Sequence, residues 1–378
     1  MKPNPFTPDD VHFMRLALRL AKRGFGETSP NPLVGAVLVK DGQIIGHGWH
    51  HRAGQPHAEI EAIRDAQAKG ARVADATLYV TLEPCSTQGR TPPCTQAILA
   101  AGLRRVVAGA TDPNPCHAGR GFGLLEKEGL RVRHGLLVEE CLRLNEAFNH
   151  WIVQRTPFVT VKAAMTLDGK IATAGGESKW ITSVPARAWG MRLRLGADAV
   201  LVGINTVLAD DPSLTLRLPA SARHKTKPQR LRRIILDAGA RTPLHAKVVT
   251  DERKALTTIV VSQSAPARRV AALAKEVNLL PAPAVRGRID LRWLLERLGA
   301  ESVTSLLVEG GGEVNASFLT QGLAQRIVFF YAPKILGGRA ARLAVAGEGL
   351  KKLEDIITLR EVAWRKLGPD LMLTARVD

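Results

Sequence analysis

Apolar residues near the start of the chain recur at helical spacing. Val11, Met14 and Leu18 are three or four residues apart, so they fall on one face of a helix. Thr7 is the expected N-cap, and Asp10, three residues later, is placed to complete a capping box. The sequence therefore predicts an amphipathic helix that begins directly after Thr7.

The pattern then changes to short apolar runs that alternate with helical segments. Two runs, residues 33–40 and 43–48, flank Asp41-Gly42, a dipeptide that favours the type I′ turn of a β-hairpin. The other strands expected in this half are residues 77–82, 104–110 and 130–135. The expected helices are residues 57–69, residues 95–101, one that ends near Gly129, and a connecting helix at residues 138–151. This alternation indicates a three-layer α/β domain.

Pro157 marks a break, after which a second series of strands and helices begins. The strands expected there are residues 158–165, 198–204, 232–237, 257–262, 305–310, 326–333 and 371–377. The helices expected between them are residues 185–195, 291–298 and 314–319. The pattern predicts two α/β domains, one over residues 1–150 and one over residues 157–378, which agrees with a length of 378 residues.

The chain is strongly basic, but its charge is dispersed. Lys and Arg number 53 and Asp and Glu 35, which gives a formal net charge of +18. Such an excess fits either a solvated basic surface or an anionic partner, such as a phosphorylated small molecule or nucleic acid. Aromatic residues make up only 4% of the chain, so stacking platforms for single-stranded nucleic acid would be scarce.

The sequence lacks the features of a membrane or secreted protein. No apolar run approaches the ~18–20 residues of a membrane span, and the first ten residues have no apolar signal-peptide core. Four irregularly spaced cysteines do not form a disulfide framework. We expect a cytoplasmic protein with no membrane partner, and the sequence is compatible with a homo-oligomer.

Four residues of the first half form a pattern that predicts a catalytic zinc site. His57, Cys85 and Cys94 offer one imidazole and two thiolates, which are good zinc ligands, and three protein ligands leave the fourth position open for water. A zinc ion lowers the pKa of that water to near neutrality, which makes hydroxide available as a nucleophile. Glu59 is close enough in sequence to His57 to move the proton without binding the metal.

The order His-x-Glu, Pro-Cys and a second Cys is the signature of zinc nucleobase deaminases, in which the glutamate is the general acid and base. In that signature two residues separate the cysteines, whereas eight separate them here. A buried histidine with two unrelated thiols is the competing interpretation. Cys116 and Cys141 lack suitable neighbours and are expected to be packing residues.

The longer segments around this site resemble one family. Residues 83–94 (EPCSTQGRTPPC), 30–39 (PNPLVGAVLV), 111–115 and 118–121 are similar to the deaminase half of the bifunctional riboflavin-biosynthesis deaminase/reductases. The resemblance implies a cytidine-deaminase-like first domain. It also implies two reactions: hydrolytic deamination of 2,5-diamino-6-(5-phosphoribosylamino)pyrimidin-4-one, and then reduction of the ribosyl group to ribityl phosphate by NADPH.

The resemblance also assigns roles within the first half. It implies that Zn²⁺ is bound by the His57, Cys85 and Cys94 set and that Glu59 shuttles the proton. It further implies substrate contacts from Asn31, His50 and Arg90, of which Arg90 could bind phosphate through bidentate hydrogen bonds. Family members often have His where this chain has Thr87. Taken alone, Asn31 would be a turn residue and Arg90 a solvated charge.

The second half resembles the reductase half of the same family, whose fold is similar to dihydrofolate reductase. It lacks a GxGxxG motif, which disfavours a Rossmann domain, but Gly310 to Gly312 lie between a predicted strand and a predicted helix, where backbone N–H groups can approach phosphate. The residues that the resemblance implies for NADPH are Ala164, Trp180, Thr206, Asp210, Gly311, Gly312, Glu313, Val314, Asn315, Ala316 and Ser317. Those that it implies for the substrate are Ser178, Arg194, Leu214, Arg217 and Glu309.

Two further residues lie near the hydride-transfer region by the same resemblance. Lys162 could supply the proton that reduction of the sugar requires, and Asp168 lies close to it in sequence. Arg194 and Arg217 suit a sugar phosphate, and Glu309 could accept hydrogen bonds from hydroxyl groups. From the pattern alone, Trp180 and Leu214 would be core residues and Asp168 a turn residue.

Two other functions remain open at this stage. The first is a deaminase that acts on RNA, such as a tRNA editor, with the second half as an RNA-binding module; the high charge favours it, but the dispersed charges and the lack of an RNA-binding signature do not. The second is a chain in which one half is inactive and supports the other, although no motif residue is missing. The sequence favours an enzyme that acts on a small phosphorylated pyrimidine without a nucleic-acid partner.

Overall fold

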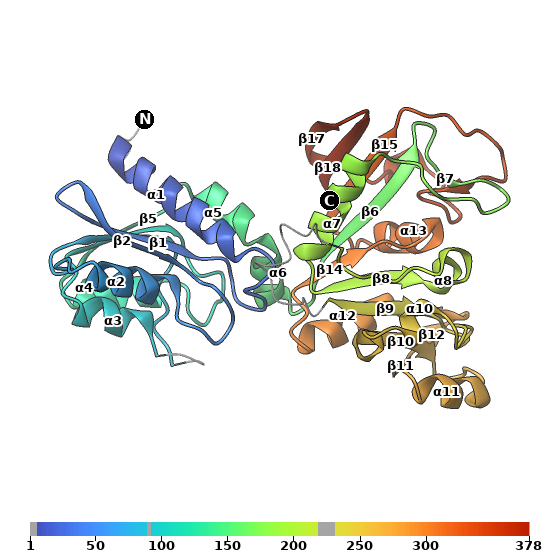
Figure 1. Cartoon of the computed structure of the whole chain (residues 1–378), viewed down its shortest axis with the longest axis horizontal. Helices are drawn as coiled ribbons and strands as arrows, with labels where there is room; N and C mark the ends of the chain where they lie inside the picture. Colours follow the sequence, from blue (N-terminus) through green and yellow to red (C-terminus); the bar gives the residue numbers. More distant parts are fainter. Residues whose placement is uncertain (1–5, 89–91, 218–230, 378) are drawn as a thin grey trace. The chain divides into compact units, whose positions relative to one another are not determined.

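The structure, a computed structural model, describes residues 6–88, 92–217 and 231–377. It divides the chain into two units, Met1–Arg155 and Thr156–Asp378 (Figure 1). The sequence pattern placed the first domain at residues 1–150 and the second at residues 157–378. No helix of the described residues has the length and apolar character needed to cross a membrane.

The first unit is built on one five-stranded sheet. Its strands are β1 (Gly35–Lys40), β2 (Gln43–Trp49), β3 (Thr77–Leu82), β4 (Arg105–Ala110) and β5 (Arg131–His134), in the order β2-β1-β3-β4-β5. Its helices are α1 (Pro8–Ala21), α2 (Ala58–Ala68), α3 (Cys94–Ala100), α4 (Arg120–Lys127), α5 (Val138–Leu144) and α6 (Glu146–Gln154). A short 3₁₀ turn, Lys22–Gly24, follows α1. Strands β3, β4 and β5 are parallel, and β1 is antiparallel to both of its neighbours.

Separate apolar cores on the two faces of this sheet make the unit three-layered. Residues of α2, α3 and α4 pack against one face, and residues of α1 and α5 pack against the other. Alternate residues of each strand serve opposite faces; Leu78 and Val80 of β3 belong to the first core, whereas Tyr79 belongs to the second. The predicted three-layer α/β fold is therefore confirmed for this unit.

Two local signals in the sequence have the geometry that they predict. Thr7 caps α1 and forms the expected capping box, in which each residue's side chain accepts from the other's backbone: Asp10 N donates to Thr7 Oγ1 at 3.2 Å and Thr7 N to Asp10 Oδ2 at 2.9 Å. Asp41 and Gly42 both have positive φ angles, 48° and 77°, which a type I′ turn requires. The hairpin of β1 and β2 therefore forms at the predicted place.

The prediction of one connecting helix over residues 138–151 is wrong, because Asn145 separates two helices, α5 and α6. The Asn145 side chain hydrogen-bonds both backbone groups of Leu33: Leu33 N donates to Oδ1 at 2.7 Å, and Nδ2 donates to Leu33 O at 2.9 Å. This long-range contact holds Asn145 outside the helical conformation, with φ −115° and ψ 22°. Helical periodicity in the sequence does not reveal such a contact.

The second unit contains a nine-stranded sheet in the order β11-β10-β9-β8-β14-β6-β15-β18-β17. These strands are β6 (Phe158–Thr166), β8 (Ala199–Gly203), β9 (Arg232–Leu236), β10 (Thr257–Ser262), β11 (Asn278–Ala282), β14 (Ser305–Val308), β15 (Arg326–Ala332), β17 (Leu359–Leu367) and β18 (Asp370–Val377). Two small sheets pair β7 (Lys170–Ala172) with β16 (Arg342–Leu343) and β12 (Ala284–Val285) with β13 (Arg288–Ile289). Strand β18 runs antiparallel to both of its neighbours, β15 and β17, whereas the other neighbouring pairs of the large sheet are parallel.

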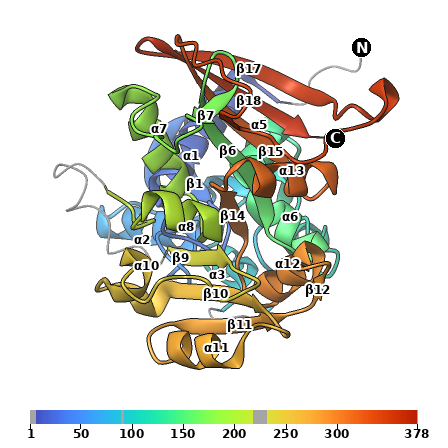
Figure 2. The ribbon, with the colours of Figure 1, turned by 90° about the vertical axis from the view of Figure 1, so that its right-hand side faces the viewer.

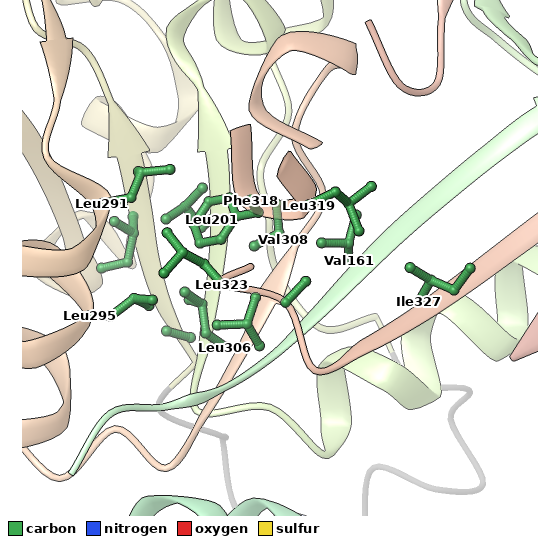
Figure 3. Close-up of a cluster of buried hydrophobic side chains, with 14 of the residues drawn as sticks. Val161, Leu201, Leu291, Leu295, Leu306, Val308, Phe318, Leu319, Leu323 and Ile327 are labelled. Atoms are coloured by element: carbon green, nitrogen blue, oxygen red, sulfur yellow. The ribbon is translucent and has the colours of Figure 1, made fainter. Parts of the chain in front are cut away.

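Helices cover this sheet from both faces, as the two views show (Figures 1 and 2). They are α7 (Val184–Leu195), α8 (Ile204–Asp210), α10 (Lys247–Thr250), α11 (Ala267–Ala274), α12 (Leu291–Ala300) and α13 (Gly312–Thr320), with 3₁₀ turns at Lys254–Leu256 and Leu353–Asp355. Leu295 of α12 and Phe318 of α13 meet Leu306 and Val308 of β14 in the largest core (Figure 3). Every strand expected in this half is present, and so are the three expected helices.

The sequence pattern missed several elements at the periphery, of which β17 is the longest. It is the edge strand of the large sheet, and most of its residues are exposed. Val362 and Trp364 are among its exposed apolar residues, and charged residues flank them on both sides, Arg360 and Glu361 before and Arg365 and Lys366 after. Without a buried face the strand has no regular alternation of apolar and polar positions, so periodicity does not detect it.

We expect Asp10→Ala to destabilise the first unit by about 3 kcal/mol, because the carboxylate is buried and also accepts from Tyr79 and Arg105, at 2.7 and 3.2 Å. Urea unfolding of the full chain measures this, with the exposed neighbour Asp9→Ala as the control.

Despite burial, the hydrogen bonds from Thr7, Arg105 and Tyr79 lower the pKa of Asp10 below 3.8. A lowered pKa stabilises the fold above the unfolded-state pKa, so the difference between wild type and Asp10→Ala should shrink as the pH falls below about 4. Equal destabilisation by both variants would contradict this role.

Candidate active sites

The predicted zinc ligands of the first unit converge although they come from three segments. His57 is the N-cap residue of α2, Cys85 follows the carboxyl end of β3, and Cys94 is the first residue of α3. His57 Nδ1 lies 3.5 Å from Cys85 Sγ and 3.2 Å from Cys94 Sγ, and one donor atom from each residue fits within 4.8 Å. Among the described residues this is the group that could hold a metal ion.

The electrostatics of the cluster suit a cation. A hydrogen bond from the Cys94 thiol, together with the neighbouring His57, lowers the pKa of Cys85 to about 4, and the same pairing raises the pKa of Cys94. The backbone N–H of Cys94 also donates to Cys85 Sγ at 3.3 Å. The cluster thus stabilises one thiolate without a metal, and a bound cation would favour the second thiolate.

Glu59 lies beside the cluster in the first turn of α2 and is buried. Burial, with the nearby Cys85 thiolate, raises the pKa of Glu59 to about 7. Its Oε2 atom has no hydrogen-bond partner among the described residues. A buried carboxylate oxygen without a partner is unusual, and it is explained if a ligand or a water molecule bound at this site provides the partner.

Asn31 and His50, both predicted substrate residues, are joined by a hydrogen bond in the same region. The Asn31 amide donates to His50 Nε2 at 3.1 Å, and His50 Nδ1 donates to the Pro56 carbonyl at 3.1 Å. The His50 ring is 5.2 Å from that of His57, centroid to centroid, and burial lowers the pKa of His50. Both nitrogens of His50 have protein partners, so this histidine orients Asn31. Arg90 lies outside the described residues.

Sequence reasoning missed the part played by Glu83, the residue before the Pro-Cys pair. Its buried carboxylate accepts three backbone N–H groups: those of Asp112 and Gly119, each at 3.0 Å, and that of Gly121 at 2.8 Å. A Cβ atom at Gly121 would lie 2.2 Å from the Pro84 carbonyl oxygen, so the chain approaches the metal-ligand loop closely there. Glu83 therefore fixes residues 112–121 beside Cys85. The motif around residues 111–121 was visible in the sequence, but its partner was not.

The second unit contains a cavity of about 1280 Å³ that collects most of the residues predicted for the reductase. The predicted residues that line it are Lys162, Ala164, Ser178, Trp180, Arg194, Thr206, Asp210, Leu214, Arg217, Glu309, Gly311 and Asn315. Those that do not line it are Gly312, Glu313, Val314, Ala316 and Ser317 of helix α13. Asp168 is also outside the lining; its carboxylate accepts from Leu336 N and Gly337 N at 3.1 and 2.7 Å, so it holds a turn.

The three consecutive glycines at the start of α13 have different surroundings. A Cβ atom at Gly310 would lie 2.6 Å from the Val314 side chain, and one at Gly312 would lie 2.2 Å from the Leu343 carbonyl oxygen. At Gly311 the nearest atom would be Thr206 Oγ1, at 3.7 Å, which is an ordinary contact. Packing therefore requires Gly310 and Gly312, whereas the fold leaves room at Gly311, on the wall of the cavity.

Arg194 and Glu309 bind each other instead of facing the cavity independently. Arg194 Nε and Nη2 donate to the two carboxylate oxygens at 2.9 and 2.8 Å, and Nη1 donates to the Thr215 carbonyl at 2.9 Å. Burial alone would raise the pKa of Glu309, but Arg194, with Lys162 and Arg217, lowers it to about 2. Arg194 thus holds an ionised Glu309 at the wall of the cavity, which Arg217 also lines.

Comparison with known proteins agrees with both sites. Residues 157–373 match the RibD C-terminal domain, and residues 7–110 match the zinc-binding region of cytidine and deoxycytidylate deaminases. The riboflavin biosynthesis protein RibD of Escherichia coli is 42% identical over 372 residues, which cover 96% of this chain and 98% of that protein. The chain belongs to the RibD family.

Other RibD proteins are similar over the same extent. RibD of Actinobacillus pleuropneumoniae is 41% identical, with 97% of this chain and 95% of that protein covered. Acinetobacter baumannii RibD superposes with a TM-score of 0.86 at 35% identity, covering 98% of this chain and 99% of that one. A Thermotoga maritima structure described as a diaminohydroxyphosphoribosylaminopyrimidine deaminase/5-amino-6-(5-phosphoribosylamino)uracil reductase has a TM-score of 0.84 at 36% identity, with the same coverage.

These matches confirm the resemblance found in the sequence. The chain has the deaminase and reductase domains of a bifunctional RibD enzyme of riboflavin biosynthesis, and the predicted fold classes of both domains are confirmed. The alternative interpretation assigned the second half to an RNA-binding module. Residues 157–373 match the RibD C-terminal domain instead.

We expect Glu83→Gln to impair deamination while zinc remains bound, because an amide has only one oxygen to accept the three backbone N–H groups that Glu83 binds. Residues 112–121 would then lose their fixed position, and KM for the pyrimidine should rise about tenfold. Steady-state ammonia release and metal analysis measure the two effects. Glu61→Gln, on the partly exposed part of α2, is the control. Loss of zinc together with activity would show that Glu83 only supports the fold of the metal site.

Proposed function

We propose that residues 1–150 deaminate 2,5-diamino-6-(5-phosphoribosylamino)pyrimidin-4-one and that residues 157–378 then reduce its ribosyl group with NADPH. The observation that carries the proposal is the convergence of His57 Nδ1 with two cysteine sulfurs beside a buried Glu59 oxygen that has no partner in the part of the chain that the structure describes. The Thermotoga maritima relative is described as an enzyme with the same two activities.

The donor set of the first unit fits Zn²⁺, since one imidazole nitrogen and two thiolates are preferred ligands and a fourth position stays open. Bound there, zinc would act as a Lewis acid and lower the pKa of a water molecule to near neutrality. Glu59 takes a proton from the attacking water and delivers it to the departing amine, and its raised pKa suits both steps near neutral pH. Asn31, oriented by His50, holds the pyrimidine ring.

The cavity of the second unit fits NADPH together with a sugar phosphate. NADPH would supply the hydride, and Gly311, at the N-terminus of α13, lets the cofactor approach backbone N–H groups without a side chain in the way. Arg217 binds the substrate phosphate, and the ionised Glu309 accepts hydrogen bonds from sugar hydroxyls. Lys162, which also lines the cavity, donates the proton that the reduced sugar requires.

We further assign the enzyme to the cytoplasm and to a small-molecule substrate, without a nucleic-acid or membrane partner. All four cysteines are free, and Cys85 and Cys94 must stay reduced to act as thiolate ligands. Reduced thiols are maintained in the cytosol but not in secreted proteins.

One assay tests the pair of activities. Zinc-loaded full-length protein is mixed with the diaminopyrimidinone phosphate and NADPH, and ammonia release and NADPH oxidation are followed together. We expect ammonia release without NADPH, but no NADPH oxidation until deaminated product is present. Oxidation of NADPH with no prior deamination would overturn the proposed order.

Glu59→Gln and Cys85→Ser should separate proton transfer from metal binding. Glu59→Gln keeps the shape of the side chain but removes the base, so the zinc content should stay near one per chain while deamination falls ~10²–10⁴-fold. Cys85→Ser should lower the zinc content itself. Both variants should reduce already deaminated substrate at the wild-type rate. If Glu59→Gln lost its zinc, Glu59 would be a ligand and the proposed role would be wrong.

Gly311→Val should weaken NADPH binding at least about tenfold, or about 1.4 kcal/mol, because the added side chain enters the cavity. The fold should tolerate valine, since Gly311 has φ −67° and ψ 174°, and a Cβ atom there has no close neighbour. Fluorescence titration with NADPH measures the Kd. Gly239→Val is the matched control, because a Cβ atom there also meets only ordinary contacts and Gly239 lies outside the cavity lining. Unchanged NADPH affinity in Gly311→Val would remove this glycine from the cofactor site.

A further inference from the structure

The first unit has a second concave site, which neither proposed reaction uses. A cavity of about 390 Å³ lies at the amino ends of β3, β4 and β5, on the face of the sheet that α1 covers. Its lining contains five basic residues: Lys40, Arg104, Arg105, Arg131 and Arg133. Its volume is within the range of small-molecule sites.

Three of these arginines lie on one face of two neighbouring strands. Arg105 of β4 and Arg131 of β5 are register partners in the parallel pair, and Arg133 is two residues farther along β5. Side chains two residues apart on a strand share a face, so the three guanidinium groups project to the same side. Like charges on neighbouring strands destabilise a sheet unless an opposite charge offsets their repulsion.

Acidic residues of the described lining supply opposite charge. Asp10 forms an ion pair with Arg105 at 3.1 Å, and it also accepts from Tyr79. Asp41 and Asp75 are the other acidic residues of the lining. Among the described residues, the lining has five basic and three acidic side chains, an excess of positive charge that suits an anionic ligand such as phosphate.

The site is separate from the zinc ligands. It adjoins Thr77, the first residue of β3, whereas Cys85 follows the last residue of that strand, Leu82. Six strand residues span roughly 17–20 Å. A ligand at one end would therefore not contact the other.

We propose that this cavity binds the phosphate group of a small phosphate monoester. Arginine is suited to the task because its planar guanidinium group forms two parallel hydrogen bonds with phosphate oxygens. The Thr7 and Thr77 hydroxyls, which also line the cavity, can donate to the ester. The arginines of β5 are at the edge of the sheet, where charge also prevents strand pairing between molecules; that role alone would need no ligand.

The test compares wild type with the Arg131→Gln/Arg133→Gln variant, as zinc-loaded full-length proteins. Calorimetric titration with ribose 5-phosphate, AMP and inorganic phosphate should detect a binding event in the wild type whose affinity falls at least tenfold in the variant. The ligand that binds most tightly shows whether the site prefers a sugar phosphate, a nucleotide or free phosphate. Arg64→Gln/Lys69→Gln, an equal change of charge on α2, should bind as the wild type does.

Hydrogen exchange locates the binding without any substitution. Addition of the tightest ligand should protect the amides of β5 (Arg131–His134) and the start of β4, in addition to any protection in the reductase cavity. Ribose without phosphate should give no protection there. Two results would show that the site does not bind phosphate: unchanged exchange of β4 and β5 with every ligand, or a β5 variant that titrates as the wild type does. The arginines would then only prevent strand pairing at the edge of the sheet.

Discussion

The convergence of three donor atoms, one from His57 and two from Cys85 and Cys94, is the constraint on which the first unit depends. The donors come from the starts of two helices and the loop after β3, and they lie within 4.8 Å of one another. The donor atoms can lie this close together only if α2 and α3 pack against the same face of the sheet. Residues of both helices do share one core there. The three-layer fold is thus the means by which distant segments form one metal site.

Buried polar contacts hold the loops around that site. Glu83 uses its carboxylate to fix residues 112–121, and Asn145 joins the backbone of Leu33 to the junction of α5 and α6. Both contacts bridge segments that are far apart in the sequence. Since an unpaired buried polar group is costly, each contact favours one arrangement of its loop over all others.

The second unit keeps a charged carboxylate and a stretch of glycine backbone accessible at the wall of a large cavity. Gly310 and Gly312 let α13 begin close to Val314 and Leu343, and this leaves Gly311 on the cavity wall. The buried pair of Arg194 and Glu309 keeps a carboxylate ionised in a site that would otherwise favour its neutral form. Arg194 therefore holds Glu309 in place, and Arg217 lines the same cavity.

The sequence by itself determined the features that depend on local interactions or on residue chemistry. The capping box of Thr7 and Asp10, the Asp41-Gly42 turn and the central strands all follow from contacts between near neighbours or from burial on a regular face. His57, Cys85 and Cys94, which converge in the structure, could also be singled out from the sequence, because imidazole and thiolate groups suit a metal ion. Tertiary structure alone decided the break at Asn145, the exposed edge strand β17, the pairing of Arg194 with Glu309 and the arginine cluster at β4 and β5. Each of these depends on which distant segment lies opposite, and neither periodicity nor residue type carries that information.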